Sequence, residues 1–219
     1  MTPGSGIQVE GVTVARGGLA LLAPVDFTLE PASSLALSGQ NGSGKTTLLR
    51  VLAGRTPPTT EQVLIGGSPT NERDPRFRAR VAALIGLPPL ARNLTLTEHL
   101  TLIRVSWGAT TRDAAAGARR LLSELRLENL GARFPHELSS GQTQLFCLAV
   151  TLARPFEVLL LDEPEQRLDE DRLELVTAML LTLKQSGTTV VIASHHAAMI
   201  STVADATLTL REPVAPHEQ

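Results

Sequence analysis

The order of apolar and polar residues near the start of the chain is typical of β-strands. Residues 7–10 and 25–29 alternate between the two kinds, as strands with one buried face do. The pair Gly17-Gly18 between them is typical of a hairpin turn, and a further strand is predicted over residues 62–65. An antiparallel β-subdomain is therefore predicted for this part of the chain.

From residue 34 onward, short apolar segments alternate with segments of helical character. The apolar segments, typical of strands buried on both faces, are residues 34–38, 81–85, 158–161, 189–193 and 206–210. Residues 46–53 and 171–185 are predicted to be helices, and the second carries Leu173, Val176 and Leu180 on one side. Strands that alternate with helices predict a mostly parallel sheet covered on both faces.

A long helical segment interrupts this alternation. Residues 94–138 change to helical character, and either Thr95 or Thr97 can cap a first helix there. Residues 113–127 carry Ala and Leu at helical spacing. The predicted fold class is therefore α/β, with a mostly parallel sheet, an N-terminal antiparallel β-subdomain and an inserted α-helical subdomain.

Composition and charge narrow the class of protein. The 219 residues are 42% apolar, enough for a sizeable core, and their formal net charge is −2 with no basic block. No nucleic-acid partner is therefore expected. The single cysteine, Cys147, permits no intrachain disulfide and is expected to be a small buried residue on a helix.

The sequence shows no signal for membrane insertion. No segment approaches the roughly 20 apolar residues that a membrane span requires, and residues 1–6 lack the basic and apolar regions of a signal peptide. A cytoplasmic protein is therefore expected. If this protein serves a membrane process, a second polypeptide has to cross the bilayer.

A glycine-rich loop matches the pattern G-x-x-x-x-G-K-[ST] between a predicted strand and a predicted helix. It consists of Gly39, Gln40, Asn41, Gly42, Ser43, Gly44, Lys45 and Thr46, with Thr47 next in the helix. Its glycines allow backbone N–H groups to wrap around a polyphosphate, and the helix N-terminus adds partial positive charge. Lys45 is predicted to reach the β- and γ-phosphates of ATP, and Thr46 to offer its hydroxyl to Mg²⁺.

Two acidic residues follow the apolar segment at residues 158–161. Ligands of α/β proteins bind at the carboxyl ends of strands, which is where Asp162 and Glu163 are expected. Such a pair can also cap a helix, but the phosphate loop upstream favours a metal and water site. Asp162 is predicted to hold Mg²⁺, mostly through water, and Glu163 to act as general base for the attacking water.

The pentapeptide Leu138-Ser139-Ser140-Gly141-Gln142 is a further motif. It is similar to the LSGGQ signature of ATP-binding cassette (ABC) ATPases, with Ser140 in place of the first glycine. It stands between the phosphate loop and the carboxylate pair, as in that family. With all three motifs the chain resembles an ABC ATPase from about residue 7 to residue 210.

The resemblance implies a site shared between two molecules. Members of the family pair head to tail around two ATP molecules, so Ser139, Gly141 and Gln142 would act on the partner's nucleotide. The family's D-loop falls on residues 166–169, where only Leu168 and Asp169 agree with the family pattern. The implied partners are thus a second ABC ATPase domain and, for a transporter, a membrane-spanning subunit.

Two histidines follow the apolar segment at residues 189–193. A histidine at this position can contact a γ-phosphate or its attacking water, although it can also close a strand for packing alone. The spacing in the family favours His195 over His196 as this contact.

The organisation of the family implies one ABC ATPase domain over residues 1–219. Residues 7–87 and 141–210 would form its catalytic core. Residues from about 88 to 140 would form the helical subdomain that leads into the signature. Residues 211–219 are expected to be a flexible tail.

Two positions depart from the family pattern. The family has a glutamine after the strand predicted over residues 81–85, where it touches Mg²⁺ and the attacking water and lines the groove for the membrane partner. Gly86 stands there in this chain. The family also stacks an aromatic ring on adenine at a position that falls on Arg16. A guanidinium can lie flat on a base, so Arg16 is either an adenine contact or a solvated hairpin residue.

The function that the resemblance implies is that of a transporter's motor. The subunit would bind and hydrolyse ATP, dimerise on ATP as a homodimer or heterodimer, and power a separate membrane-spanning partner from the cytoplasmic face. A stand-alone cassette of the iron–sulfur-assembly or cell-division type is the alternative. A GTPase or P-loop kinase is disfavoured, because no N-K-x-D motif is present and a kinase has no need of residues 138–142.

Overall fold

The computed structural model describes residues 5–213 and divides the chain into two compact units. Unit 1 contains the described parts of Met1–Ile85, Phe156–Glu163 and Thr177–Gln219. Unit 2 contains Gly86–Pro155 and Pro164–Val176. Of the tail predicted over residues 211–219, residues 214–219 lie outside the described residues.

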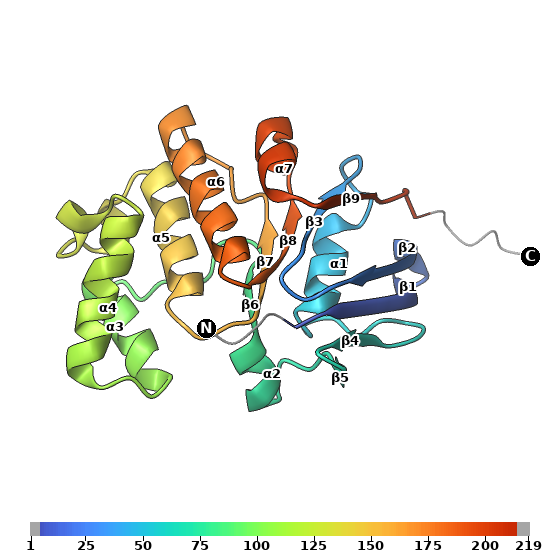
Figure 1. Cartoon of the computed structure of the whole chain (residues 1–219), viewed down its shortest axis with the longest axis horizontal. Coiled ribbons are helices and arrows are strands. Elements are labelled where there is room, and N and C mark those ends of the chain that lie inside the picture. Colours follow the sequence, from blue (N-terminus) through green and yellow to red (C-terminus); the bar gives the residue numbers. More distant parts are fainter. Residues whose placement is uncertain (1–4, 214–219) are drawn as a thin grey trace, which may run out of the picture. The chain divides into compact units, whose positions relative to one another are not determined.

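Unit 1 contains an antiparallel sheet with the strand order β2-β1-β4-β5 (Figure 1). Its strands are β1 (Ile7–Arg16), β2 (Leu19–Leu29), β4 (Val63–Ile65) and β5 (Ser68–Pro69). β1 and β2 form the predicted hairpin, whose turn residues Gly17 and Gly18 have φ of 58° and 79°. Both strands are longer than the predicted ones, because register shifts between Val9 and Ala15 break the strict alternation.

A parallel sheet of five strands forms the second layer of unit 1, in the order β6-β7-β8-β3-β9. Its strands are β3 (Ser34–Ser38), β6 (Val81–Leu84), β7 (Val158–Asp162), β8 (Thr189–Ala193) and β9 (Ala206–Thr209). All neighbouring pairs run parallel. Since β8 lies between β3 and β7, the three segments that follow these strands leave the sheet at one edge.

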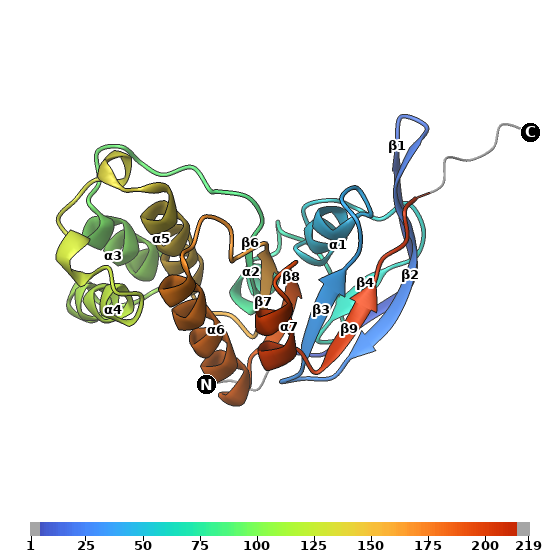
Figure 2. The same ribbon diagram turned by 90° about the horizontal axis from the view of Figure 1, so that it is seen from above.

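Helix α1 (Lys45–Leu52) contacts strands of both sheets and shares the core between them (Figure 2). Its side chains Leu48, Leu49 and Leu52 are completely buried. Burying one such side chain contributes about 1.5–3 kcal/mol. The phosphate loop therefore leads into one of the most firmly packed helices of this unit.

Two short helices of unit 1 have no counterpart among the predicted elements. They are α2 (Pro75–Arg80) and α7 (Ala197–Val203). Asp74 caps α2 and Pro75 opens it, whereas His196 caps α7. Each is too short to carry an apolar stripe over several turns, so the periodicity did not indicate it.

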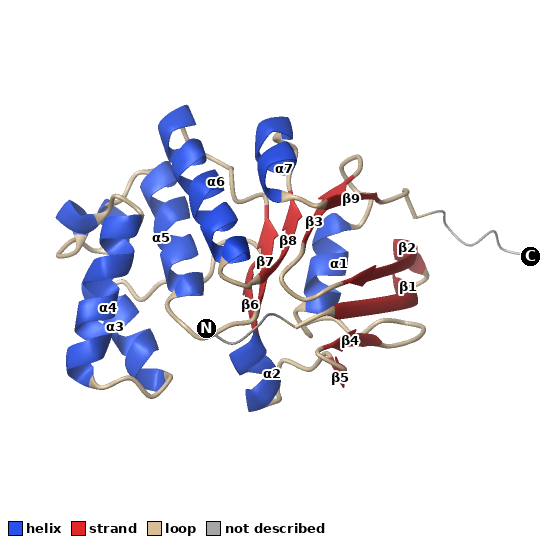
Figure 3. Cartoon of the chain, in the orientation of Figure 1, coloured by secondary structure: helices blue, strands red, loops and turns tan. Residues whose placement is uncertain are grey.

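Unit 2 consists of helices and loops throughout its described residues (Figure 3). Its elements are α3 (Leu96–Ser106), α4 (Thr111–Glu124), η1 (Glu128–Leu130), η2 (Pro135–Glu137), α5 (Ser140–Leu152) and the start of α6 (Glu170–Gln185). Thr95, rather than Thr97, caps α3 and forms a capping box with Glu98. Phe146 and Cys147 on α5 are completely buried, as expected for the cysteine.

The predicted fold class is confirmed by the parallel sheet, the N-terminal antiparallel sheet and the helical unit between β6 and β7. The predicted boundaries of the helical subdomain, at about residues 88 and 140, stay a prediction. No helix within residues 5–213 has both the length and the apolar character that crossing a membrane requires.

Candidate functional site

The glycine-rich loop after β3 depends on glycine at several positions. Gly39, Gly42 and Gly44 have φ of 138°, 87° and 95°, values that other residues rarely adopt. A Cβ on Gly39 would lie 2.8 Å from the carbonyl oxygen of Leu210. One on Gly44 would lie 2.8 Å from the carbonyl oxygen of Leu21. At Gly39 and Gly44, both the backbone conformation and the space therefore exclude a side chain.

The start of α1 is arranged for an anion. No side chain among residues 5–213 caps this end, and the first turn holds no acidic residue. Its backbone N–H groups and the positive end of the helix dipole are thus available to a phosphate. Lys45 is buried, and its Nζ donates hydrogen bonds to the carbonyl oxygens of Gly39 at 2.7 Å and Gln40 at 3.0 Å. Its ammonium group therefore lies against the loop, where phosphates would bind.

The end of β7 brings a carboxylate to this loop. Asp162 accepts a hydrogen bond of 2.8 Å from the hydroxyl of Thr46 at its Oδ2. Burial raises the pKa of Asp162 above its usual value, although the Thr46 hydrogen bond opposes the rise; the neighbouring Glu163 raises the pKa further. A cation beside Asp162 would favour its ionised form.

Glu163 and His195 meet at the same edge of the sheet. The N–H of Glu163 donates to the carbonyl oxygen of Ala193 at the end of β8, at 2.8 Å. Glu163 has a φ of 48°, unusual for a residue with a side chain. Its Oε1 lies 3.7 Å from Nε2 of His195. His196 instead accepts a hydrogen bond from the N–H of Met199 and caps α7, which favours His195 for a role in the site.

A hollow of about 510 Å³ lies over the loop, a volume typical of small-molecule sites. Its lining residues are Ala20, Leu21, Asn41, Gly42, Gly44, Lys45, Thr46, Thr47, Glu163 and Pro213. Most of them were predicted from the loop motif and the carboxylate pair. Ala20, Leu21 and Pro213 were not, because they belong to no motif.

Arg16 lines a neighbouring hollow of about 470 Å³ rather than the one over the loop. The two hollows share Leu21 and Thr47. Arg50 and Arg55 line the second hollow as well, and no motif pointed to them. The predicted base contact and the phosphate loop are therefore next to each other, with two further arginines beside them.

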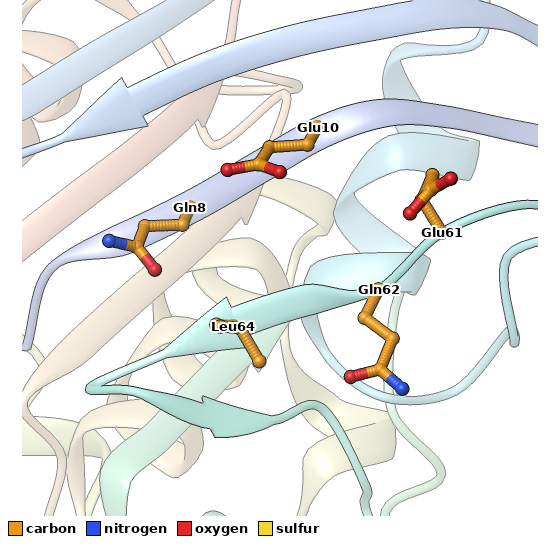
Figure 4. A pocket seen from close by; sticks show the side chains of 5 residues that line it. All are labelled: Gln8, Glu10, Glu61, Gln62 and Leu64. Atoms are coloured by element: carbon orange, nitrogen blue, oxygen red, sulfur yellow. The ribbon is translucent and has the colours of Figure 1, made fainter.

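A third hollow lies on the exposed side of the antiparallel sheet (Figure 4). Its lining residues are Gln8, Glu10, Glu61, Gln62 and Leu64. Glu10 and Glu61 bring two carboxylates to it and no basic residue lines it, which makes it unsuitable for a polyphosphate. The hollow over the loop remains the candidate nucleotide site.

In unit 2, the signature motif forms the start of α5. Ser139 caps the helix by accepting a hydrogen bond from the N–H of Gln142, whose side-chain oxygen accepts one from the N–H of Ser139 at 2.9 Å. A Cβ on Gly141 would lie 2.7 Å from the carbonyl oxygen of Arg167. The capping box and the close approach at Gly141 therefore favour Ser, Gly and Gln at these positions, apart from any role in binding.

The two remaining predicted positions also belong to unit 2. Asp169 accepts a hydrogen bond of 3.0 Å from the N–H of Arg172. Its carboxylate also forms an ion pair of 2.9 Å with the guanidinium of Arg172. Gly86 is exposed with a φ of 68°, and a Cβ there would meet no atom within 4 Å. The Gly86 position therefore has room for a side chain, while its backbone conformation favours glycine.

Comparison with known proteins identifies the family. The model of the family described as "ABC transporter" matches residues 22–166. A putative ABC transporter ATP-binding protein of Brucella suis biovar 1 is 34% identical over 94% of this chain and 85% of its own length. The Fe(3+) ions import ATP-binding protein FbpC of Brucella abortus is also 34% identical, over 96% of this chain and 59% of its own length.

A solved structure supports the fold assignment. It is a dimeric ATP-binding cassette in a post-hydrolysis state with ADP and Pi, and it has a TM-score of 0.85 and 24% identity. The similarity covers 97% of both chains. The chain belongs to the ABC transporter family, as an ATP-binding protein that hydrolyses ATP.

Proposed function

We propose that this chain is the ATP-hydrolysing subunit of a membrane transporter and works with Mg²⁺, a second cassette and a separate membrane-spanning protein. The observation that carries the proposal is the hydrogen bond between Thr46 and Asp162. It joins the phosphate loop to the end of β7, where Glu163 follows. A hydroxyl, a carboxylate and a candidate base beside one phosphate loop are the groups that phosphoryl transfer to water requires.

The residues at this point fit Mg²⁺. The ion prefers oxygen ligands and keeps several of its waters, and Thr46 and Asp162 supply a hydroxyl and a carboxylate oxygen side by side. We assign these two residues to hold it, Asp162 mostly through water. When bound, the ion neutralises negative charge on the phosphates.

The other residues of the site have distinct roles in this proposal. The loop from Gly39 to Thr47 wraps the phosphates with its N–H groups, and Lys45 balances the charge of the β- and γ-phosphates. Glu163 accepts the proton of the attacking water, because its backbone is anchored to Ala193 and holds the carboxylate at the sheet edge. His195 contacts the γ-phosphate or that water.

The signature motif completes the site of a second molecule. Ser139 and Gln142 hold each other in the capping box, so the start of α5 has a fixed geometry. Together with Gly141 and Asp169, they would act on the nucleotide of the partner cassette. A γ-phosphate between two molecules makes dimerisation depend on ATP, and hydrolysis releases the pair.

Mixing two inactive variants tests this arrangement. Ser140→Glu adds a carboxylate to the first turn of α5, which the helix dipole tolerates but a phosphate repels. Lys45→Ala disables the phosphate loop, and each variant alone is expected to be inactive. A mixed dimer then has one intact shared site, so the mixture should regain activity. A mixture as inactive as either variant would contradict the shared site, and Ser140→Gln is the uncharged control.

We assign the membrane contact to residues 86–97 of unit 2 and place the subunit at the cytoplasmic face. Leu87 in this segment is 46% exposed, which suits an apolar contact. The relative FbpC is named as an ATP-binding protein for import of Fe(3+) ions, which supports transport over a stand-alone role. Since Gly86 replaces the family's glutamine, basal hydrolysis should be slow without the membrane partner.

Purification from native membranes tests the transport assignment. A tagged chain extracted in mild detergent should bring down a polytopic membrane protein, and ATPase activity of that complex should exceed that of the subunit alone. Leu87→Asp should abolish the association, whereas Leu102→Asp, the same change at an exposed residue of α3 outside this segment, should leave it. Recovery of the chain without any membrane protein would favour the stand-alone cassette.

A further inference from the structure

His99 on α3 is a buried polar residue of unit 2. The residue is 7% exposed, and both nitrogens of its ring have partners. The N–H of Ala91 donates a hydrogen bond of 3.0 Å to Nε2, and Nδ1 lies 3.0 Å from the carbonyl oxygen of Thr95. Because a backbone N–H can only donate, Nε2 accepts here without a proton of its own, and Nδ1 donates its proton to Thr95.

The loop that Ala91 belongs to has few other polar attachments. Residues 87–94 form no helix or strand. No hydrogen bond other than the one from Ala91 to His99 joins them to the rest of the part that the structure describes. Ala91 is itself exposed, whereas the ring that it contacts is buried. The imidazole therefore helps to set where this loop lies on the helical unit.

The same ring contacts the helix that carries the signature motif. Its plane is at 88° to that of Phe146 on α5, and the ring centroids are 5.6 Å apart, which is an edge-to-face contact. Phe146 is completely buried, and α3 packs against α5 (Figure 2). The imidazole thus lies between an exposed loop and the helix that begins at Ser140.

We propose that His99 is a positioning residue that couples the membrane contact to the signature motif through its acceptor at Nε2. The inference rests on the proposed function, which assigns residues 86–97 to the membrane partner. A partner that displaces the loop would pull on His99 through Ala91, and the packed interface of α3 with α5 would pass the displacement on. For packing alone an apolar side chain would suffice, since a buried polar ring is costly unless it is hydrogen-bonded.

Two substitutions separate the acceptor from the ring. His99→Phe keeps a ring against Phe146 and removes the acceptor, and water can satisfy the N–H of the exposed Ala91. His99→Gln loses the ring, but its amide oxygen can accept from Ala91 in place of Nε2. Coupling through the acceptor should therefore be lost in the first variant and kept in the second.

ATPase assays of the complex extracted in mild detergent, and of the subunit alone, test the coupling. In His99→Phe the stimulation by the co-purified membrane protein should fall about threefold or more, while the subunit alone keeps its wild-type rate and melting temperature. His99→Gln should keep the stimulation of the wild type. Undiminished stimulation in His99→Phe, or an equal loss in both variants, would overturn the proposal. So would a fall in the rate or melting temperature of the isolated His99→Phe subunit, because His99 would then serve folding.

Amide exchange in the isolated chain tests the hydrogen bond itself. The amide of Ala91, followed by NMR, should exchange about fivefold faster in His99→Phe than in the wild type or His99→Gln, the effect of one hydrogen bond. The amide of Leu148 on α5 should stay as protected as in the wild type. Equal exchange of Ala91 in all three proteins would also overturn the proposal.

The failure of this inference differs from a failure of the proposed function. If no membrane protein accompanies the wild-type chain, the transport assignment fails and the coupling fails with it. If the wild-type complex forms and its membrane protein stimulates His99→Phe equally, only the role of His99 fails.

Discussion

The hydroxyl of Thr46 donates a hydrogen bond of 2.8 Å to a carboxylate oxygen of Asp162, 116 residues further along the chain. Thr46 ends the phosphate loop that follows β3, and Asp162 ends β7. In the parallel sheet β8 lies between these two strands. Neither motif alone indicates a metal site with certainty, because a phosphate loop and a pair of acids each have other uses. Their contact joins them into one site.

Asp162→Asn should impair the use of Mg²⁺ but leave the loop intact. The amide oxygen can still accept the hydrogen bond from Thr46, whereas the negative charge is lost. The Mg²⁺ concentration for half-maximal ATPase activity should rise at least about tenfold. Titrating MgCl₂ at fixed ATP checks this, with Asp171→Asn, an exposed change on α6, as control. An unchanged Mg²⁺ requirement would remove Asp162 from the metal site.

Local sequence patterns predicted most of the elements, because apolar periodicity and glycine turns act over short distances. β8 was predicted with its observed bounds, and the hairpin at Gly17-Gly18 was predicted correctly. α2 and α7 were missed, since a capping residue such as Asp74 or His196 defines them more than any apolar stripe does. The sequence pattern also did not reveal that β8 lies between β3 and β7.

The sequence predicted those residues of the candidate site that belong to a motif. Lys45, Asp162 and Glu163 each occupy a recognisable pattern. Arg50 and Arg55 do not, because what places them beside Arg16 is the packing of α1 against the hairpin strand β2. Residues that reach a site through tertiary contacts alone have no local sequence signal.

Gly141→Ala should destabilise the helical unit. The added Cβ would lie 2.7 Å from the carbonyl oxygen of Arg167, and backbone cannot move away as a side chain can. We expect the free energy of unfolding to fall by about 1–3 kcal/mol in urea denaturation. Gly117→Ala is the matched control, also within a helix, where the Cβ would meet only the flexible end of Arg104. Equal effects of the two changes would contradict the close approach.

Asp205→Asn should change how stability depends on pH. Burial alone would raise the pKa of Asp205, but hydrogen bonds from Lys184 and Ser34 outweigh it and hold that pKa below its usual value. The ionised carboxylate therefore stabilises the fold above the unfolded pKa of about 4, and this contribution is lost as the pH falls below it.

Urea unfolding of wild type and Asp205→Asn at two pH values measures this contribution. Near neutral pH the variant should be less stable by about 1 kcal/mol or less, since Asp205 is half exposed and solvent screens the pair. At about pH 3 the difference should shrink, because the unfolded carboxyl is then largely protonated, and this proton uptake offsets the stabilisation of the ionised carboxylate in the folded state. A difference that stays constant between the two pH values would argue against the ionic contribution.

Cys147 should be unreactive in the folded protein. Its side chain is completely buried, and burial raises the pKa of the thiol to about 11, although the charge of Arg167 opposes the rise. Thiol reagents attack the thiolate, so labelling at about pH 8 should occur only after unfolding. Mass spectrometry of the native and urea-treated chain checks this. Stoichiometric labelling of the native protein would show that α5 opens.

Hydrolysis at the edge formed by Asp162, Glu163 and His195 is the central claim, and Glu163→Gln tests it most directly. The amide keeps the size of the side chain and cannot accept the proton of the attacking water. ATP binding should equal that of the wild type, while the ATPase rate should fall at least about 100-fold. A variant that binds ATP and turns it over at nearly the wild-type rate would contradict the account.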